Sequence, residues 1–233
     1  ESAFHGTDGI LAGARRGLIV IDSTTADPAS TERLGAELAA AGVTLVDAPL
    51  GRTPREAEAG TLDAMVGADD ATFARVLPVI ECWAGKISRT GPVGSAHKMK
   101  LLMNFISMGY AALYAEALTL GAKSGIAPQI VRDVIGASRL SNGFFETFMR
   151  AAVDRDFEVH RFTIENASKD VRYGAAMALA TGTLNPLGAA VRNTFAHVEA
   201  TGHGGDYVGM LADHVARLSG IELAEAVTAG KAR

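Results

Sequence analysis

The amino-acid sequence predicts an α/β layer followed by an all-helical part, within a chain of 233 residues. Before residue 93, short apolar runs typical of strands alternate with helix-like segments, a pattern that favours an α/β layer with a partly parallel sheet. After residue 94 the strand-like runs disappear, and long helical segments are separated by glycine or proline. We therefore expect two domains, residues 1–93 and residues 94–233, the second built on a long central helix.

The segments of the first part are bounded by residues that begin or end helices. Asp27 precedes Pro28, as an N-cap precedes proline at the first helical position, and Gly42 is suited to end that helix. Asp69 begins a further helix, which Pro78 bends or breaks. The predicted strands are residues 17–22, 44–50, 62–66 and 86–90, and the predicted helices are residues 28–42 and 69–85.

The second part begins with a long helix predicted over residues 95–124, which Gly125 ends. Pro128 then begins the next helix. The other predicted helices are residues 162–180, 187–201 and 206–218.

Composition excludes several classes of function. The chain is 48% hydrophobic and 21% charged, values that are ordinary for a globular protein. A net charge of -4 argues against nucleic acid and anionic membrane as partners, and the apolar runs are shorter than the roughly 20 residues of a membrane span. Cys82 is the only cysteine, so an internal disulfide is impossible and a cytoplasmic location is expected. We expect Cys82 to be buried.

The segment G-P-V-G-S-A-H-K-M-K-L-L-M-N at residues 91–104 carries the most chemical information. Lys100 and Asn104 lie four residues apart on a predicted helix, so their side chains share one face. An ammonium and an amide at that spacing can hold one oxygen from two sides and move a proton to it, which predicts carbonyl/alcohol redox chemistry. A solvated surface lysine and a core asparagine with a satisfied hydrogen bond are the structural alternatives.

Two kinds of binding motif are absent from the sequence. No G-x-G-x-x-G occurs, so the usual dinucleotide fingerprint is missing, and the glycines at 91, 94 and 202–205 do not stand between a strand and a crossover helix. The six histidines show no ligand spacing such as H-E-x-x-H, so we predict no metal.

Four segments together resemble one enzyme family. They are D-S-T-T at 22–25, D-A-P at 47–49 continued by A-E-A-G-T-L at 57–62, the glycine-to-asparagine segment at 91–104, and K-D at 169–170. In this order they resemble motifs of the β-hydroxyacid dehydrogenases, the family that includes 3-hydroxyisobutyrate dehydrogenase. The resemblance implies that residues 1–93 are the C-terminal part of a Rossmann-type domain that binds NAD or NADP.

The resemblance also implies how the chain relates to a whole enzyme. Family members carry the glycine fingerprint in an N-terminal βαβ unit, so we expect this sequence to begin part-way through the fold and to bind the cofactor poorly alone. The choice between NAD and NADP stays open. Residues 94–233 would bind substrate and form a homodimer or homotetramer.

The family resemblance assigns roles to individual residues. Lys100 would be the general acid in reduction and the general base in oxidation, and Asn104 would hold the substrate oxygen and orient Lys100. His97 and Lys98 would be solvent-facing or structural. The residues expected to contact the cofactor are Thr24, Thr25, Phe162 and Lys169.

The expected substrate loop departs from the family pattern. Gly51, Arg52 and Thr53 replace the usual Ser-Gly-Gly after D-A-P-V, and we expect all three to bind substrate. An arginine brings a planar fork that suits an oxyanion, and the loop resembles that of sulfolactaldehyde reductases; alternatively, Arg52 points to solvent. The substrate would be a small anionic β-hydroxyacid or sulfonate and its semialdehyde, with sulfolactaldehyde and 4-hydroxybutyrate/succinic semialdehyde specificities as alternatives.

A different class of function remains open from the sequence. The chain would then be a catalytically silent helical dimerisation module. The Lys100/Asn104 pair favours the enzyme, because a module that only packs has no use for both residues on one helix face.

Overall fold

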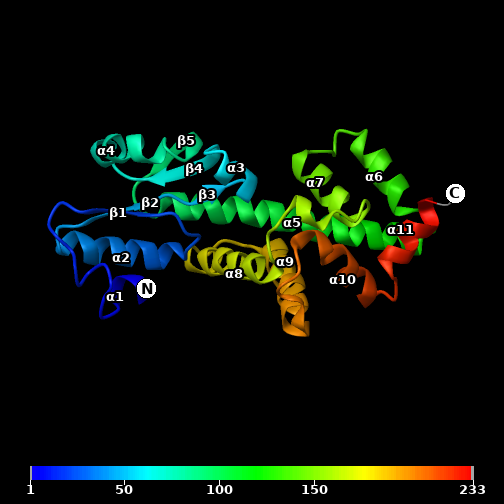
Figure 1. The fold of residues 1–233 in the computed structure, drawn as a ribbon. Coiled ribbons are helices and arrows are strands. Elements are labelled where there is room, and N and C mark those ends of the chain that lie inside the picture. Colours follow the sequence, from blue (N-terminus) through cyan, green and yellow to red (C-terminus); the bar gives the residue numbers. More distant parts are fainter. Residues whose placement is uncertain (1, 232–233) are drawn as a thin grey trace. The chain divides into compact units, whose positions relative to one another are not determined.

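The computed structural model describes residues 2–231, and the chain divides into two compact units (Figure 1). The first unit comprises Glu1–Met103 with Leu179–Thr181, and the second comprises Asn104–Ala178 with Gly182–Arg233. The first contains a mixed sheet and the second is helical, which confirms the predicted fold class. The long helix α5, Ser95–Lys123, contributes residues to both units.

The sheet of the first unit has five strands in the order β1-β2-β4-β3, with β5 paired to β4. β1 and β2 are parallel, β2 and β4 antiparallel, and β4 and β5 parallel, so the sheet is partly parallel as predicted. The strands are β1 Ile19–Asp22, β2 Thr44–Asp47, β3 Leu50–Gly51, β4 Leu62–Gly67 and β5 Ala84–Gly91. The helices are α1 Ser2–His5, α2 Pro28–Ala40, α3 Pro54–Glu58 and α4 Asp70–Ile80.

Helices cover both faces of the sheet (Figure 1). The side chains of β2 point alternately to one face and to the other. Leu45 is buried with Leu38 of α2, whereas its neighbour Val46 is buried with Val76 of α4. Successive side chains of a strand point to opposite faces, so each face acquires its own apolar layer. Burying a side chain of this size stabilises the fold by roughly 1.5–3 kcal/mol.

Side-chain caps define the starts of α2 and α4. Asp27 accepts a hydrogen bond from the N–H of Ala29 at 3.1 Å, as the Asp27-Pro28 pair predicts. Asp69 accepts from the N–H of Thr72 at 2.9 Å and from its hydroxyl at 2.8 Å, and these bonds lower the pKa of the Asp69 carboxyl. Both helices therefore begin where local capping signals place them.

Two expectations for this region are wrong. α4 ends at Ile80 rather than near residue 85, because residues 81–83 form a turn that leads directly into β5. Cys82 lies in that turn and is exposed instead of buried, with its thiol donating to the carbonyl of Pro78.

The second unit consists of helices around one apolar core. The helices from α6 onward are α6 Pro128–Gly136, α7 Gly143–Ala152, α8 Ile164–Ala180, α9 Pro186–Val198, α10 Leu211–Leu218 and α11 Leu223–Lys231. Neither α7 nor α11 was predicted from the sequence. The helix predicted over 187–201 changes at its end into a π-helical turn, Glu199–His203, where Gly202 has a φ of 90°.

α5 supplies the centre of this core. By length and composition alone the helix could cross a membrane, a test that core helices of soluble proteins also pass. Its side chains Met108, Ala111, Ala115 and Leu118 are at most 1% exposed and pack with α7, α8 and α9 residues such as Phe145. α5 is therefore the core helix of the second unit.

Candidate active site

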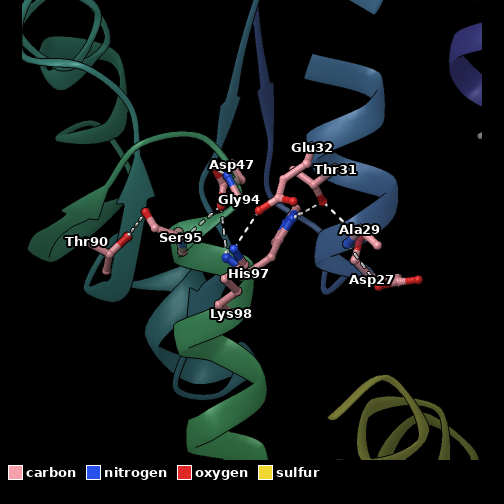
Figure 2. A network of polar contacts seen from close by, with 11 residues as sticks. Asp27, Ala29, Thr31, Glu32, Asp47, Thr90, Gly94, Ser95, His97 and Lys98 are labelled. Atoms are coloured by element: carbon pink, nitrogen blue, oxygen red, sulfur yellow. Dashed lines mark hydrogen bonds and ion pairs between the residues drawn. The ribbon is translucent and has the colours of Figure 1, made fainter. Parts of the chain in front are cut away.

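The first turn of α5 is capped by a carboxylate from the end of β2 (Figure 2). Asp47 is fully buried, and its Oδ1 accepts from the N–H of Gly94 at 2.8 Å. Its Oδ2 accepts from the N–H groups of Ala96 and His97, each at 2.9 Å. The first N–H groups of a helix have no partner within the helix, and a negative charge there is favourable. Asp47 thus fixes where α5 begins.

Two glycines make room for this cap. A Cβ on Gly67, which pairs with Asp47 across the sheet, would lie 2.1 Å from the Asp47 Oδ1. Gly94 has a φ of +89°, a conformation that favours glycine. Substituting either position would disturb the helix start.

His97 connects this turn to α2 (Figure 2) and also to the loop after β1. Its ring is fully buried, with Nδ1 2.7 Å from the Thr31 hydroxyl and Nε2 3.0 Å from the Thr24 carbonyl oxygen. Because a carbonyl only accepts hydrogen bonds, Nε2 carries the proton. His97 is therefore structural, and the solvent-facing alternative for it is wrong.

The loop held by His97 carries the residues predicted to contact the nicotinamide. The N–H of Thr24 donates to the carboxylate of Asp22 at 2.9 Å, which shapes the turn. Thr24 is exposed and Thr25 half-buried. They follow the carboxyl end of β1, the edge at which open α/β sheets bind their ligands. Both threonines therefore lie at the edge of the sheet where a ligand of this fold would bind.

Lys100 and Asn104 lie on consecutive turns of the continuous helix α5. Lys100 is half-buried, and Asn104 is only 8% exposed. The Asn104 Nδ2 donates to the Oδ2 of Asp170 on α8 at 2.7 Å. The core hydrogen bond considered as an alternative for Asn104 therefore exists, but an amide has a second N–H and an acceptor oxygen as well.

Asp170, the second residue of the K-D pair, is a candidate site residue that the sequence did not single out beside Lys169. It is 3% exposed, and its Oδ1 lies 3.3 Å from the Nζ of Lys169. The Lys169 ammonium also lies 5.9 Å from the ring centre of Tyr173. The K-D pair in the sequence could have indicated Asp170. A buried carboxylate requires partners, and two predicted site residues, Lys169 and Asn104, provide them.

Phe162 lies two residues before α8 and is half-buried against the second core. Its carbonyl accepts from the N–H of Val208 at 2.9 Å, and its ring centre is 6.1 Å from that of His160. The predicted start of this helix at residue 162 is wrong because the adjacent Thr163 forms an isolated bridge with Tyr207.

Arg52 has a backbone conformation that usually favours glycine. Its φ is 77°, and its side-chain Nε donates to the Oδ1 of Asp63 at 2.8 Å. The left-handed region costs a non-glycine residue roughly 1–2 kcal/mol. The family pattern has glycine at this position, so the substitution of arginine introduces backbone strain at the predicted substrate loop.

The other two residues of this loop serve the local fold. Gly51 is buried and pairs with Asp63 of β4. The N–H and the hydroxyl of Thr53 both donate to Oε2 of Glu56, which lowers the pKa of the Glu56 carboxyl. Thr53 thus caps α3, and both of its donors are engaged.

Two family models cover most of the chain. Residues 1–91 match the NAD binding domain of 6-phosphogluconate dehydrogenase. Residues 94–213 match the NAD-binding domain of NADP-dependent 3-hydroxyisobutyrate dehydrogenase. These matches define the class: a chain of an NAD(P)-dependent oxidoreductase.

Individual relatives agree with the family models. The 3-hydroxyisobutyrate dehydrogenase of Pseudomonas aeruginosa is 32% identical over 86% of this chain and 70% of its own length. The 3-sulfolactaldehyde reductase of Escherichia coli is 29% identical over 88% of this chain and 68% of its own length. The 2-(hydroxymethyl)glutarate dehydrogenase of Eubacterium barkeri is 34% identical over 59% of this chain. The matched part covers 46% of the length of that dehydrogenase.

A solved structure shares the fold. The Mycobacterium tuberculosis 3-hydroxyisobutyrate dehydrogenase with L-serine has a TM-score of 0.80 and 28% identity, over 90% of this chain and 73% of that one. The chain belongs to the β-hydroxyacid dehydrogenase family of 3-hydroxyisobutyrate dehydrogenase, as the four sequence segments predict. Members of this family use NAD or NADP as cofactor.

Proposed function

We propose that the protein carrying this chain interconverts a small anionic β-hydroxyacid and its semialdehyde by hydride transfer, with Lys100 as general acid/base. The observation that supports this most is that Lys100 and Asn104 lie four residues apart on the continuous helix α5. Asp47 caps the helix one turn before Lys100, and Asp170 holds the Asn104 amide. Proton transfer requires a donor fixed relative to the reacting oxygen, and α5 provides one.

The chain's own residues handle the proton and the substrate oxygen. Bound NAD or NADP supplies or accepts the hydride. In reduction, the Lys100 ammonium gives a proton to the oxygen that becomes the hydroxyl, and in oxidation the amine takes it back. Asn104 directs its second N–H to the same oxygen while Asp170 fixes the amide plane. We assign the cofactor contacts to Thr24, Thr25, Phe162 and Lys169.

We further propose that Arg52 recognises the anionic group of the substrate. Asp63 accepts from Nε and so fixes the guanidinium, while the two terminal nitrogens can bind an oxyanion. The similarity to a 3-sulfolactaldehyde reductase supports a sulfonate as the preferred group. The N–H and the hydroxyl of Thr53 both donate to Glu56. In this loop, the groups that we propose to bind the substrate are therefore the Arg52 guanidinium and the backbone around Gly51.

Substitution of Arg52 by glycine and by alanine separates recognition from strain. Both variants lose the guanidinium, so we expect kcat/KM for the anionic substrate to fall at least tenfold in each. Arg52→Gly relieves the strain of the left-handed backbone conformation, whereas Arg52→Ala keeps that strain. The free energy of unfolding of the glycine variant should therefore exceed that of the alanine variant by about 1 kcal/mol. Steady-state kinetics with sulfonate- and carboxylate-bearing aldehydes, and urea unfolding, measure the two effects.

Arg55→Ala is the matched control, because Arg55 is an exposed arginine of the neighbouring helix α3. It should leave both quantities unchanged. Unaltered substrate preference in both Arg52 variants would show that this guanidinium points to solvent in function.

We propose that α5 also forms a homodimer or homotetramer contact. Ile106, Leu113 and Leu120 recur every seven residues and are 53%, 59% and 69% exposed, and Tyr110 at 38% lies between them. A heptad spacing of apolar residues is the pattern with which helices pack along one seam. An exposed apolar stripe of this length favours a second copy of the helix as partner.

Leu113→Glu should therefore shift the protein to a smaller oligomer. A charge at the centre of an apolar helix seam is desolvated without a partner, which weakens the association by several kcal/mol. Sedimentation velocity across a concentration series measures the change. Leu140→Glu, at a 72% exposed position outside the stripe, is the control and should leave the oligomer intact.

A further inference from the structure

Three potential metal ligands converge in the second unit, apart from the residues assigned to the reaction. His203 ends the π-helical turn, Asp206 follows it, and His214 lies on α10. The His214 Nε2 is 2.8 Å from the Asp206 Oδ2, and the His203 Nδ1 is 3.3 Å from the same oxygen. The two imidazole centres are 4.3 Å apart, and the three ligand atoms all lie within 4.8 Å of one another.

The backbone around the cluster is well anchored. Gly202, with its φ of 90°, turns the chain at the end of α9 so that His203 faces α10. The Asp206 carbonyl accepts from the N–H of Ile164 at 2.8 Å, and Val208 donates to Phe162. A π-helical turn is rare and is frequent at functional sites. The ligands thus lie on segments already fixed to the start of α8.

We propose that His203, Asp206 and His214 bind a divalent transition-metal ion such as Zn²⁺. Two imidazoles and one carboxylate are a donor set that Zn²⁺ takes with bonds of about 2.0–2.2 Å, and the edge of such a tetrahedron is roughly 3.3 Å. The separations of 2.8 and 3.3 Å from the Asp206 oxygen are close to that edge. Small side-chain movements therefore suffice to admit the ion.

Exposure suits this assignment. The side chains of His203 and Asp206 are 45% and 29% exposed, so an ion can enter and keep water in a fourth position. The His214 side chain is only 8% exposed, so it would hold the ion from the buried side of the cluster.

The spacing H-x-x-D-x-x-x-x-x-x-x-H matches no familiar metal motif, which is why the sequence predicts no metal. The ligands become neighbours only through the π-helical turn and α10. A bound ion would join the segment that contacts Phe162 to α10, and so would stabilise the beginning of α8. This proposal does not depend on the reaction proposed above, because its test requires no turnover.

The test uses the full chain with Cys82→Ser, which removes the exposed thiol as a competing ligand. Isothermal titration with Zn²⁺ at pH 7.5, and visible absorption with Co²⁺, should show one saturable site per chain. Zn²⁺ should also raise the midpoint of thermal unfolding. His203→Gln and Asp206→Asn should each weaken binding at least tenfold, because each removes one of three ligands.

His197→Gln is the matched control, because His197 is an exposed histidine on the adjacent helix α9. It should bind Zn²⁺ as the parent chain does. Circular dichroism of each variant without metal checks that the fold is retained. The proposal is overturned if the parent chain binds no Zn²⁺, or if a folded His203→Gln variant binds it with unchanged affinity.

Discussion

Lys100→Ala should lower turnover roughly 100-fold or more in the protein that carries this chain, while the affinity for NAD or NADP changes little. The reason is that the substitution removes the group that exchanges a proton with the substrate oxygen, an effect expressed in kcat rather than in cofactor binding. Steady-state kinetics in both directions, with cofactor binding followed by fluorescence, measure the two quantities separately.

Lys98→Ala is the matched control for this experiment. Lys98 lies half a turn earlier on α5, is exposed, and pairs with Glu32 at 2.5 Å (Figure 2). An exposed ion pair contributes little, so turnover should stay within twofold. If Lys100→Ala retained full activity, Lys100 would lose its role, and the silent dimerisation module would become the better account of the chain.

Asp47→Ala should destabilise the first unit by about 3–5 kcal/mol. The substitution leaves the N–H groups of Gly94, Ala96 and His97 without their acceptor in a buried place, and each unsatisfied buried donor costs roughly 1–3 kcal/mol. Urea unfolding followed by circular dichroism measures the loss. The predicted magnitude exceeds that of an ordinary helix cap because one carboxylate serves three donors.

Asp27→Ala provides the comparison for Asp47. It removes a cap that accepts one backbone bond on α2, and should cost about 1 kcal/mol. If the two substitutions proved equally mild, water or another side chain would be satisfying the start of α5, and Asp47 would not be what fixes it.

Local signals in the sequence predicted much of the fold. The strand that ends at Asp22, the cap at Asp27 and the long helix from Ser95 follow from short-range patterns that operate within a few residues. Short elements such as β3 and α3 were missed because a two-residue strand and a five-residue helix give no period to detect.

The site was predictable only in part, because its supporting contacts span long distances in the sequence. Asp47 caps a helix that begins 48 residues later in the chain, and Asn104 contacts Asp170 across 66 residues. No local pattern encodes such pairs. The strain at Arg52 is different: a position occupied by glycine in the family pattern could have indicated a left-handed conformation in advance.

The cap at the start of α5 has a consequence for how the chain opens. A continuous helix normally exchanges its amide protons as one cooperative segment, yet α5 has its first turn tied to β2 and its later turns buried in the helical core. Fluctuations that loosen the sheet should release the turns that carry Lys100 without melting those beyond Asn104. Lys100 belongs to the first unit and Asn104 to the second, so amide exchange measured along α5 should report on the opening of each unit separately.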